Sequence, residues 1–441
     1  MNKPRFVYFI ILFISEVLIV NGQEKLSLDE SIKLAVENNV SIAKEKNNKA
    51  SAEYNEMKEK ISLLPSLNAS ANAFENTGTN FDQLTGMLRT ETGQYVNGSI
   101  TASWDILNFA NKISAIKLSK SSNESQKAQL AYTKEFIILN VVGRYLETLQ
   151  ALKQDQIYTK FCDVQEEQLR RTDELIKVGS LPGQDFYTQN AEWSRLKSLR
   201  EENLNVMNVK KNQLMLLLRL NPAKETQLDT ILSKELLKSD MNVDSLYKKA
   251  LDARKDYKKT KAQSMVKKYE LALERSKYIP SISLYYDYGS RYSSFQARQF
   301  RDQIFKDNIT TTIGVSMLVP LFNGLDTRNK VYKAKQDWDN AELDIIQAKN
   351  DIYVELKNLM STISANEKKI AYREDQIESA KRAYELEKEK YYLGQGSPLD
   401  LGVAQRNYVE ASLSLNQINY QLMYNRFELL FYTGDIISLV Q

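Results

Sequence analysis

The residues with the clearest chemical potential are two aspartates that each follow a glycine-containing turn. The segment "VGSLPGQD" (178–185) ends in Asp185, and "LGQGSPLDL" (393–401) contains Asp400. A carboxylate in the first turn of a helix interacts favourably with the helix dipole, so helix capping would explain both residues. The alternative is a functional role, in which a carboxylate at the turn attracts cations. The sequence leaves both interpretations open.

The turn residues around these aspartates suit the junction between two helices. Gly179 and Gly394 fit the left-handed position that ends a helix. Ser397 can cap the next helix, with Pro398 at its first position. The remaining turn-forming residues of the two segments are Pro182, Gly183 and Gly396.

The rest of the chain lacks the residue combinations of an enzyme. The 441 residues include no His, which removes the commonest general base and the commonest metal ligand. We find no glycine-rich phosphate loop, no nucleophile elbow and no metal-ligand spacing. We therefore predict no catalytic residues, no cofactor and no metal site. The formal net charge of +4 gives no electrostatic reason to expect nucleic acid as a partner.

The N-terminus, "MNKPRFVYFIILFISEVLIVNGQ", has a basic start, an apolar stretch and then small residues. We interpret residues 1–22 as a secretory signal peptide that is cleaved after Gly22. The alternative is a membrane anchor, but the apolar stretch is short and Glu16 interrupts it. The single cysteine, Cys162, cannot form an internal disulfide and is expected to be a small packing residue.

A repeat with an offset of 215 residues organises the mature chain. "LLPSL" recurs as "YIPSI", Gly179 matches Gly394, and Asp185 matches Asp400. We therefore predict a first repeat over 23–227, an equatorial linker over 228–241 and a second repeat over 242–441.

Each repeat is expected to be mostly helical. The expected helices are 27–62, 109–178 and 183–220 in the first repeat, and 245–278, 324–393 and 400–435 in the second. Apolar residues spaced by three and four, such as Ile138, Val141, Val142, Tyr145 and Leu149, predict one buried stripe along each long helix. Such a helix is about 105 Å long at 1.5 Å per residue, so the shorter helices are expected to cover it end to end.

Each repeat also contains two alternating segments that predict β-strands. The expected strands are about 66–74, 96–104, 281–289 and 309–319, joined by polar loops over 74–95 and 289–308. Pro65, Pro280 and Pro320 lie at the expected junctions between helices and strands. The strand lengths suit a tilted transmembrane β-barrel, although a soluble sheet with one buried face is the alternative. Four strands cannot close a barrel alone, so they would have to be shared between chains.

The duplicated layout, together with "LSLDESIKLAVENN", "LLPSL", "YIPSI", "VPLFNG" and "YYLGQGSPLDL", resembles the TolC-like outer membrane efflux proteins over nearly the whole mature chain. The resemblance implies a mostly α fold, in which a long helical hairpin barrel adjoins a trimeric 12-stranded β-barrel. It implies a location in the outer membrane of a Gram-negative bacterium, in contact with outer-membrane lipid and with a large periplasmic helical extension. The implied partners are two further copies of the chain, a periplasmic adaptor (membrane fusion) protein and an inner-membrane pump.

The implied function is the exit duct of a tripartite efflux or type I secretion system. The alternative is a structural or adhesive coiled-coil envelope protein. The family carries acidic constriction residues just after the second turn, and Asp400 matches the first of them. The chain departs from that pattern at Val403, where a second acid is usual, and at Gly396, where the pattern has Arg. Asp185 and Asp400 are therefore the expected periplasmic gate, without an arginine lock.

Overall fold

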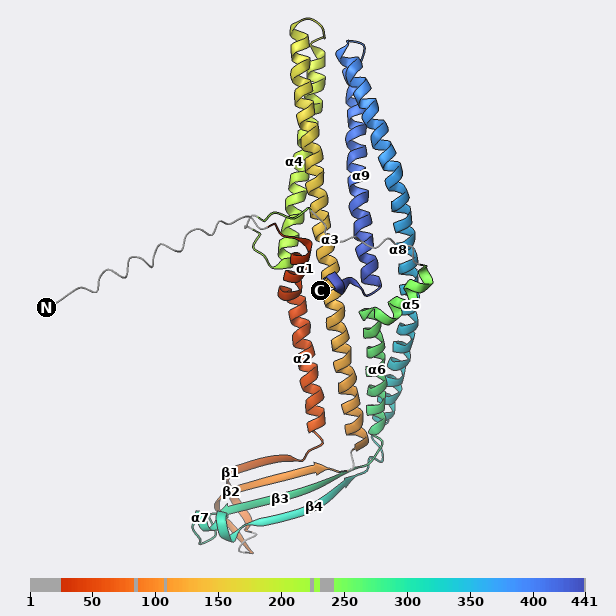
Figure 1. Cartoon of the computed structure of the whole chain (residues 1–441). Coiled ribbons are helices and arrows are strands. Elements are labelled where there is room, and N and C mark those ends of the chain that lie inside the picture. Colours follow the sequence, from red (N-terminus) through yellow and green to blue (C-terminus); the bar gives the residue numbers. More distant parts are fainter. Residues whose placement is uncertain (1–24, 83–85, 107–108, 223–225, 231–241, 440–441) are drawn as a thin grey trace, which may run out of the picture. The chain divides into compact units, whose positions relative to one another are not determined.

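The computed structural model describes residues 25–82, 86–106, 109–222, 226–230 and 242–439. The expected signal peptide and most of the expected linker, 231–241, lie outside the described residues. The chain divides into two compact units (Figure 1). One comprises 1–43, 133–254 and 352–441, and the other comprises 44–132 and 255–351.

The elements follow one another in two similar series. The first series is α1 (Leu28–Asn38), α2 (Val40–Ile61), β1 (Ser66–Asp82), β2 (Met87–Asp105), α3 (Phe109–Lys177) and α4 (Gln184–Leu218). The second is α5 (Val243–Ala253), α6 (Lys255–Ser276), β3 (Ser281–Ser293), the short helices α7 (Phe300–Asp302) and η1 (Gln303–Asp307), β4 (Thr310–Leu318), α8 (Asp326–Tyr392), α9 (Pro398–Tyr432) and η2 (Ile436–Leu439). Several elements of the second series begin 215 residues after their counterparts, as Leu28 and Val243 do.

The stretches expected to be helical over 27–62 and 245–278 are helical, and each is divided into two helices at one residue. Asn39 has extended backbone angles, its N–H donates to Ala35 O, and its side chain accepts from Ser41 N–H at 2.8 Å. This side chain ends α1 and caps α2, which a polar Asn does more readily than an apolar residue. Arg254, 215 residues later, also has extended backbone angles, and its N–H donates to Ala250 O.

The four strands form one antiparallel sheet in the order β1-β2-β3-β4 (Figure 1). Its two faces differ, as the alternation predicted. Ile313 and Val315 of β4 are 75% and 66% exposed on the apolar face. On the polar face, Thr101 donates to the Asp287 carboxylate at 2.6 Å across neighbouring strands. β1 and β4 are the two edges of the sheet.

The polar loop expected over 74–95 was largely wrong, whereas the loop expected over 289–308 was wrong only at its start and in its short helices. β1 and β2 stay paired as far as Asp82 and Met87. Threonine pairs face each other across this ribbon, with Oγ1 atoms 3.0 Å apart for Thr77 and Thr92. Threonine is β-branched and suits a strand, so the polarity of this segment concealed a hairpin. On the other side, β3 continues to Ser293 before the short helices begin.

The long helices bury the predicted apolar stripes. Ile138, Val141, Val142, Tyr145 and Leu149 of α3 are at most 1% exposed. On α8, Ile352, Leu356, Leu359 and Ile363 are at most 5% exposed. Burying such side chains gives roughly 1.5–3 kcal/mol each, so these stripes contribute strongly to helix pairing. No helix in the described parts of the chain is long and apolar enough to cross a membrane.

The N-terminal segment is attached to the middle of α3. Leu26 N–H donates to Gln227 O at 2.8 Å, and Asp229 N–H donates to Leu26 O at 3.0 Å. The buried Tyr145 hydroxyl lies 2.9 Å from Leu26 O and 2.7 Å from Asp229 O. Burial raises the pKa of this phenol well above its ordinary value, so the hydroxyl stays a hydrogen-bond donor.

Candidate functional site: the tips of two helical hairpins

Two helical hairpins, α3–α4 and α8–α9, end in short turns (Figure 1). Gly179 and Gly394 close the long helices with φ of +73° and +72°. The N–H of Gly179 donates to Ile176 O, and the next N–H, of Ser180, donates to Leu175 O. Gly394 makes the same pair of bonds to Tyr391 O and, through Gln395, to Lys390 O. These are Schellman motifs, which satisfy the last carbonyls of a helix.

The helices that follow start differently. Ser397 is the N-cap of α9, its hydroxyl accepts from Leu399 N–H at 3.1 Å, and Pro398 occupies the first helical position. Gly183 is the N-cap of α4 and has no side chain to cap with. There Asp185 N–H donates to Pro182 O instead. The residues of the second turn therefore cap the N-terminus of α9 better than those of the first turn cap α4.

Asp185 is buried between the two hairpins. The residue is 7% exposed, and its carboxyl group lies near the buried Tyr391 hydroxyl, which is 3.3 Å from Thr172 Oγ1. Burial raises the pKa of Tyr391 to about 12, and the Asp185 charge adds to the rise. Nothing in the sequence indicated that Tyr391 would reach Asp185.

Asp400 has a different environment. It is exposed and lines an open groove between α8 and α9, together with Glu387, Lys390, Gly396 and Val403. Its charge contributes to a raised pKa of Lys390, after the larger effect of the hydrogen bond from Lys390 to Glu387. The structure therefore does not bring the two predicted gate residues to one site within a chain.

Gly396 is required by close packing at the second tip. A Cβ at this position would lie 2.9 Å from Tyr391 N, a backbone atom that cannot move aside cheaply. Any larger residue would therefore have to shift the turn. This explains in physical terms why the chain has no arginine at this position.

Polar contacts join the two hairpins below their tips. Gln168 of α3 donates to the Tyr384 hydroxyl of α8, and both side chains are buried. Glu192 of α4, 9% exposed at its side chain, accepts from Arg406 of α9 at 3.0 Å and from Arg195 at 2.6 Å. Neither Glu192 nor Gln168 was among the predicted site residues. Both are polar residues within helical segments, where an apolar pattern gives no sign of them.

Each of the three junction prolines lies between a helix and a strand. Pro65 stands between α2 and β1, Pro280 between α6 and β3, and Pro320 between β4 and α8. Near the first junction the Trp104 indole N–H donates to Leu63 O at 2.9 Å, which ties β2 to the end of α2.

The single cysteine packs as the sequence suggested. Cys162 is buried against Leu196 and Val409, and burial raises the pKa of its thiol.

These tips offer packing and charge rather than reaction chemistry. Within the described ranges, no group of three or more His, Cys, Asp or Glu side chains could hold a metal ion.

Comparison with known proteins relates this chain to a family. Residues 246–435 match the model of the outer membrane efflux protein family. The match lies within the second repeat, and this part of the chain is similar to that family. It indicates an outer membrane transport protein of the efflux type rather than an enzyme. No curated protein sequence matches the chain significantly.

Solved structures extend the match over both repeats. The Campylobacter jejuni CmeC outer membrane channel is 19% identical, with a TM-score of 0.82 over 93% of this chain and 86% of that one. The Vibrio cholerae outer membrane protein VceC is 15% identical, with a TM-score of 0.80 over 92% and 96% of the two chains. The open state of the Neisseria gonorrhoeae MtrE outer membrane channel is 18% identical, with a TM-score of 0.77 over 94% and 90%.

The matches confirm the resemblance and the mostly helical fold with four antiparallel strands. At such low identity the solved structures show the fold alone. The assembly and the roles of particular residues therefore remain predictions.

Proposed function

We propose that this protein is the outer-membrane exit duct of a tripartite efflux or type I secretion system. In this role it receives cargo from a periplasmic adaptor protein and an inner-membrane pump. The observation that carries the proposal is the two-faced sheet. A sheet with an exposed apolar face and a polar face of Ser, Thr and Asp residues provides a lipid surface and a water-lined surface at once.

The sheet also motivates the proposal of a homotrimer. β1 and β4 have no partner on their outer edges among the described strands, and open edges are not tolerated in lipid. Three copies joined β4 to β1 would supply twelve strands and close the sheet. The helical hairpins would then form the periplasmic part of the duct, after removal of the signal peptide at residues 1–22.

Within that assembly, we propose that Asp400 lines the periplasmic entrance. It is the exposed aspartate of the pair and would occur three times around one axis. Like charges at close range repel by about 1 kcal/mol per pair at high dielectric, and less once salt screens them. A ring of three is therefore tolerable, and it would attract cations.

Two measurements test the proposal. The mass of the mature protein in mild detergent should be that of a trimer, and the protein should form steady ion-conducting pores in planar bilayers. A monomer without conductance would refute the duct. A stable trimer without conductance would favour the alternative, a structural or adhesive envelope protein.

A pair of substitutions tests the two faces of β4. Val315→Asp places a carboxylate on the proposed lipid face, whereas Thr312→Asp places it on the polar face. A basic side chain at mid-depth costs about 2–4 kcal/mol and an acid less, so Val315→Asp should lower the yield of folded trimer while Thr312→Asp should not. Equal losses from both variants would contradict the assignment of the faces.

A further inference from the structure

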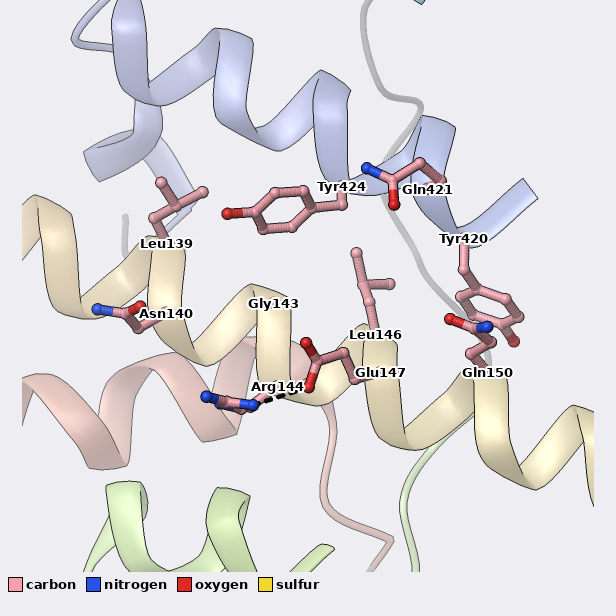
Figure 2. A pocket seen from close by; sticks show the side chains of 10 residues that line it. All are labelled: Leu139, Asn140, Gly143, Arg144, Leu146, Glu147, Gln150, Tyr420, Gln421 and Tyr424. Carbon is pink, nitrogen blue, oxygen red and sulfur yellow. Dashed lines mark hydrogen bonds and ion pairs between the residues drawn. The ribbon is translucent and has the colours of Figure 1, made fainter. Parts of the chain in front are cut away.

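A pocket between α3 and α9 lies well away from the hairpin turns. It has a volume of about 350 Å³ and is lined by residues 139–150 of α3 and 420–424 of α9 (Figure 2). This volume is in the range of small-molecule sites. Asn416 Nδ2 of α9 donates to Gln150 O of α3 at 3.1 Å, which fixes the two helices at one end of the pocket.

The floor of the pocket depends on a glycine. The ring of Tyr424 lies over Gly143 (Figure 2), and a Cβ added to Gly143 would be 3.1 Å from Tyr424 Cε2. A second phenol, Tyr420, stands beside Gln150 (Figure 2). Both rings are partly buried. The pocket therefore presents two aromatic side chains, which can contact a flat apolar molecule.

The charges of the lining compensate each other. The only charged lining residues are Arg144 and Glu147, which form an ion pair at 2.9 Å (Figure 2). Glu147 also binds Lys210 at 3.0 Å, and Arg144 donates to Gln213 at 3.1 Å. A charged ligand would find no unpaired countercharge in the lining, so an uncharged ligand suits the pocket.

The uncharged polar side chains of the lining are free to bind a ligand within the described parts of the chain. Across the described parts of the chain, the side chains of Asn140, Gln150, Gln421, Tyr420 and Tyr424 have no hydrogen-bond partner. The three amides can each donate and accept, and each phenol can do both. A ligand with amide or hydroxyl groups would satisfy several of them at once.

The pocket opens on a definite side of α3. Tyr145 lies about 200° around the helix from Gly143, at about 100° per residue, and its hydroxyl binds the N-terminal segment. The N-terminal segment therefore covers the face of α3 that lies opposite the pocket. In a trimeric duct the bulky covered face must lie outside, because a central tunnel has no room for it. The pocket then faces the tunnel.

We propose that this pocket is a cargo-contact site for uncharged aromatic small molecules that carry amide or hydroxyl groups. The proposal rests on the proposed duct function and adds a substrate class to it. Cargo would pause against Tyr420 and Tyr424 on its way through the tunnel, while the three amides bind its polar groups.

The test uses chloramphenicol, a neutral aryl amide with two hydroxyls, as the probe for the mature protein in detergent. Saturation-transfer NMR and equilibrium dialysis should show saturable binding. Gly143→Leu, which fills the floor, should raise Kd at least tenfold, and Tyr424→Ala at least fivefold. Tyr187→Ala, which removes a 73% exposed tyrosine of α4, is the matched control and should change Kd less than twofold.

Several outcomes would overturn the proposal. These are the absence of saturable binding, an unchanged Kd in Gly143→Leu, or equal binding of benzoate, which would contradict the neutral class. Saturable binding of N,N′-diacetylchitobiose without binding of chloramphenicol would show a sugar site instead. If Gly143→Leu does not fold, Gln421→Leu at an exposed position replaces it and should raise Kd at least threefold.

A bilayer recording separates this proposal from the duct itself. Chloramphenicol should cause concentration-dependent current fluctuations in the wild type that are lost in Tyr424→Ala. Pores that conduct without any effect of the probe would refute only the cargo site. A protein that forms no pores would refute the duct, whatever binding is measured.

Discussion

The two hairpin tips occupy equivalent places in the duplicated sequence, yet they surround their aspartates differently. Asp185 is 7% exposed and lies near Tyr391 of the other hairpin. Asp400 is exposed beside a groove on its own hairpin. At the next position along the chain the burial is reversed. Leu401 of the second tip is fully buried, whereas its counterpart Phe186 of the first tip is only half-buried.

This contrast shows how duplication allows two copies of a motif to diverge. Two hairpins that pack side by side present unlike faces to each other. The same helix position therefore points into the contact in one copy and away from it in the other. Capping chemistry is shared by both tips, and the difference between them comes from packing.

The largest expected effect is at Leu401. It lies in an apolar cluster with Tyr384, Tyr391 and Ala404, and Leu→Ala in such a place costs about 2–5 kcal/mol. Leu401→Ala should lower the denaturant midpoint of the detergent-solubilised protein clearly more than Phe186→Ala does. A larger loss from Phe186→Ala would mean that the first tip, and not the second, is the better packed.

The next largest difference in stability is expected between variants of the two aspartates. Asp185→Ala and Asp400→Ala both remove a carboxylate from the first turn of a helix, which costs about 0.3–1 kcal/mol through the helix dipole. Only Asp185→Ala also removes a buried side chain that lies beside the Tyr391 hydroxyl, and changes at buried polar sites commonly cost about 1–3 kcal/mol. The free energies of unfolding of the two variants, measured by denaturant titration, should therefore differ by at least about 1 kcal/mol. Equal midpoints would show that the contact with Tyr391 contributes nothing to stability.

The helix-ending glycines should instead behave alike. Gly179 and Gly394 both have positive φ, and a Cβ at either would meet nothing within 4 Å. Only backbone strain then opposes alanine, at about 1 kcal/mol. Gly179→Ala and Gly394→Ala should lower the unfolding midpoint by similar amounts. A marked difference would reveal a contact at one tip that the single chain does not show.

The smallest expected effect on stability, and the sharpest on function, belongs to Asp400→Asn. An exposed substitution should change the unfolding free energy by less than about 0.5 kcal/mol. In bilayers it should lower cation selectivity and weaken block by multivalent cations, because the proposed ring loses its charge. Asp185→Asn serves as the control and should leave selectivity nearly unchanged. Unchanged selectivity in Asp400→Asn would leave helix capping as the role of this residue.

Most of the fold could be predicted because its signals are local or periodic. The buried stripe of α3 follows from residues three and four apart, such as Ile138 and Val142, and both are at most 1% exposed. The features that escaped prediction have local causes too. The Asn39 interruption escapes a periodicity search because a single residue barely disturbs the pattern. The β1–β2 ribbon beyond 74 resembles a loop because threonines on paired strands are as polar as loop residues.

The sequence by itself determined the duplication, the helix ends and the alternation of the strands, since each depends on neighbours along the chain. Only the tertiary structure decided that Asp185 meets Tyr391, that Glu192 meets Arg406, and that Tyr424 lies over Gly143. These contacts join residues more than 200 positions apart. Their partners are fixed by how one helix is rotated against another, and a rotation of one residue's step, about 100°, would replace every one of them.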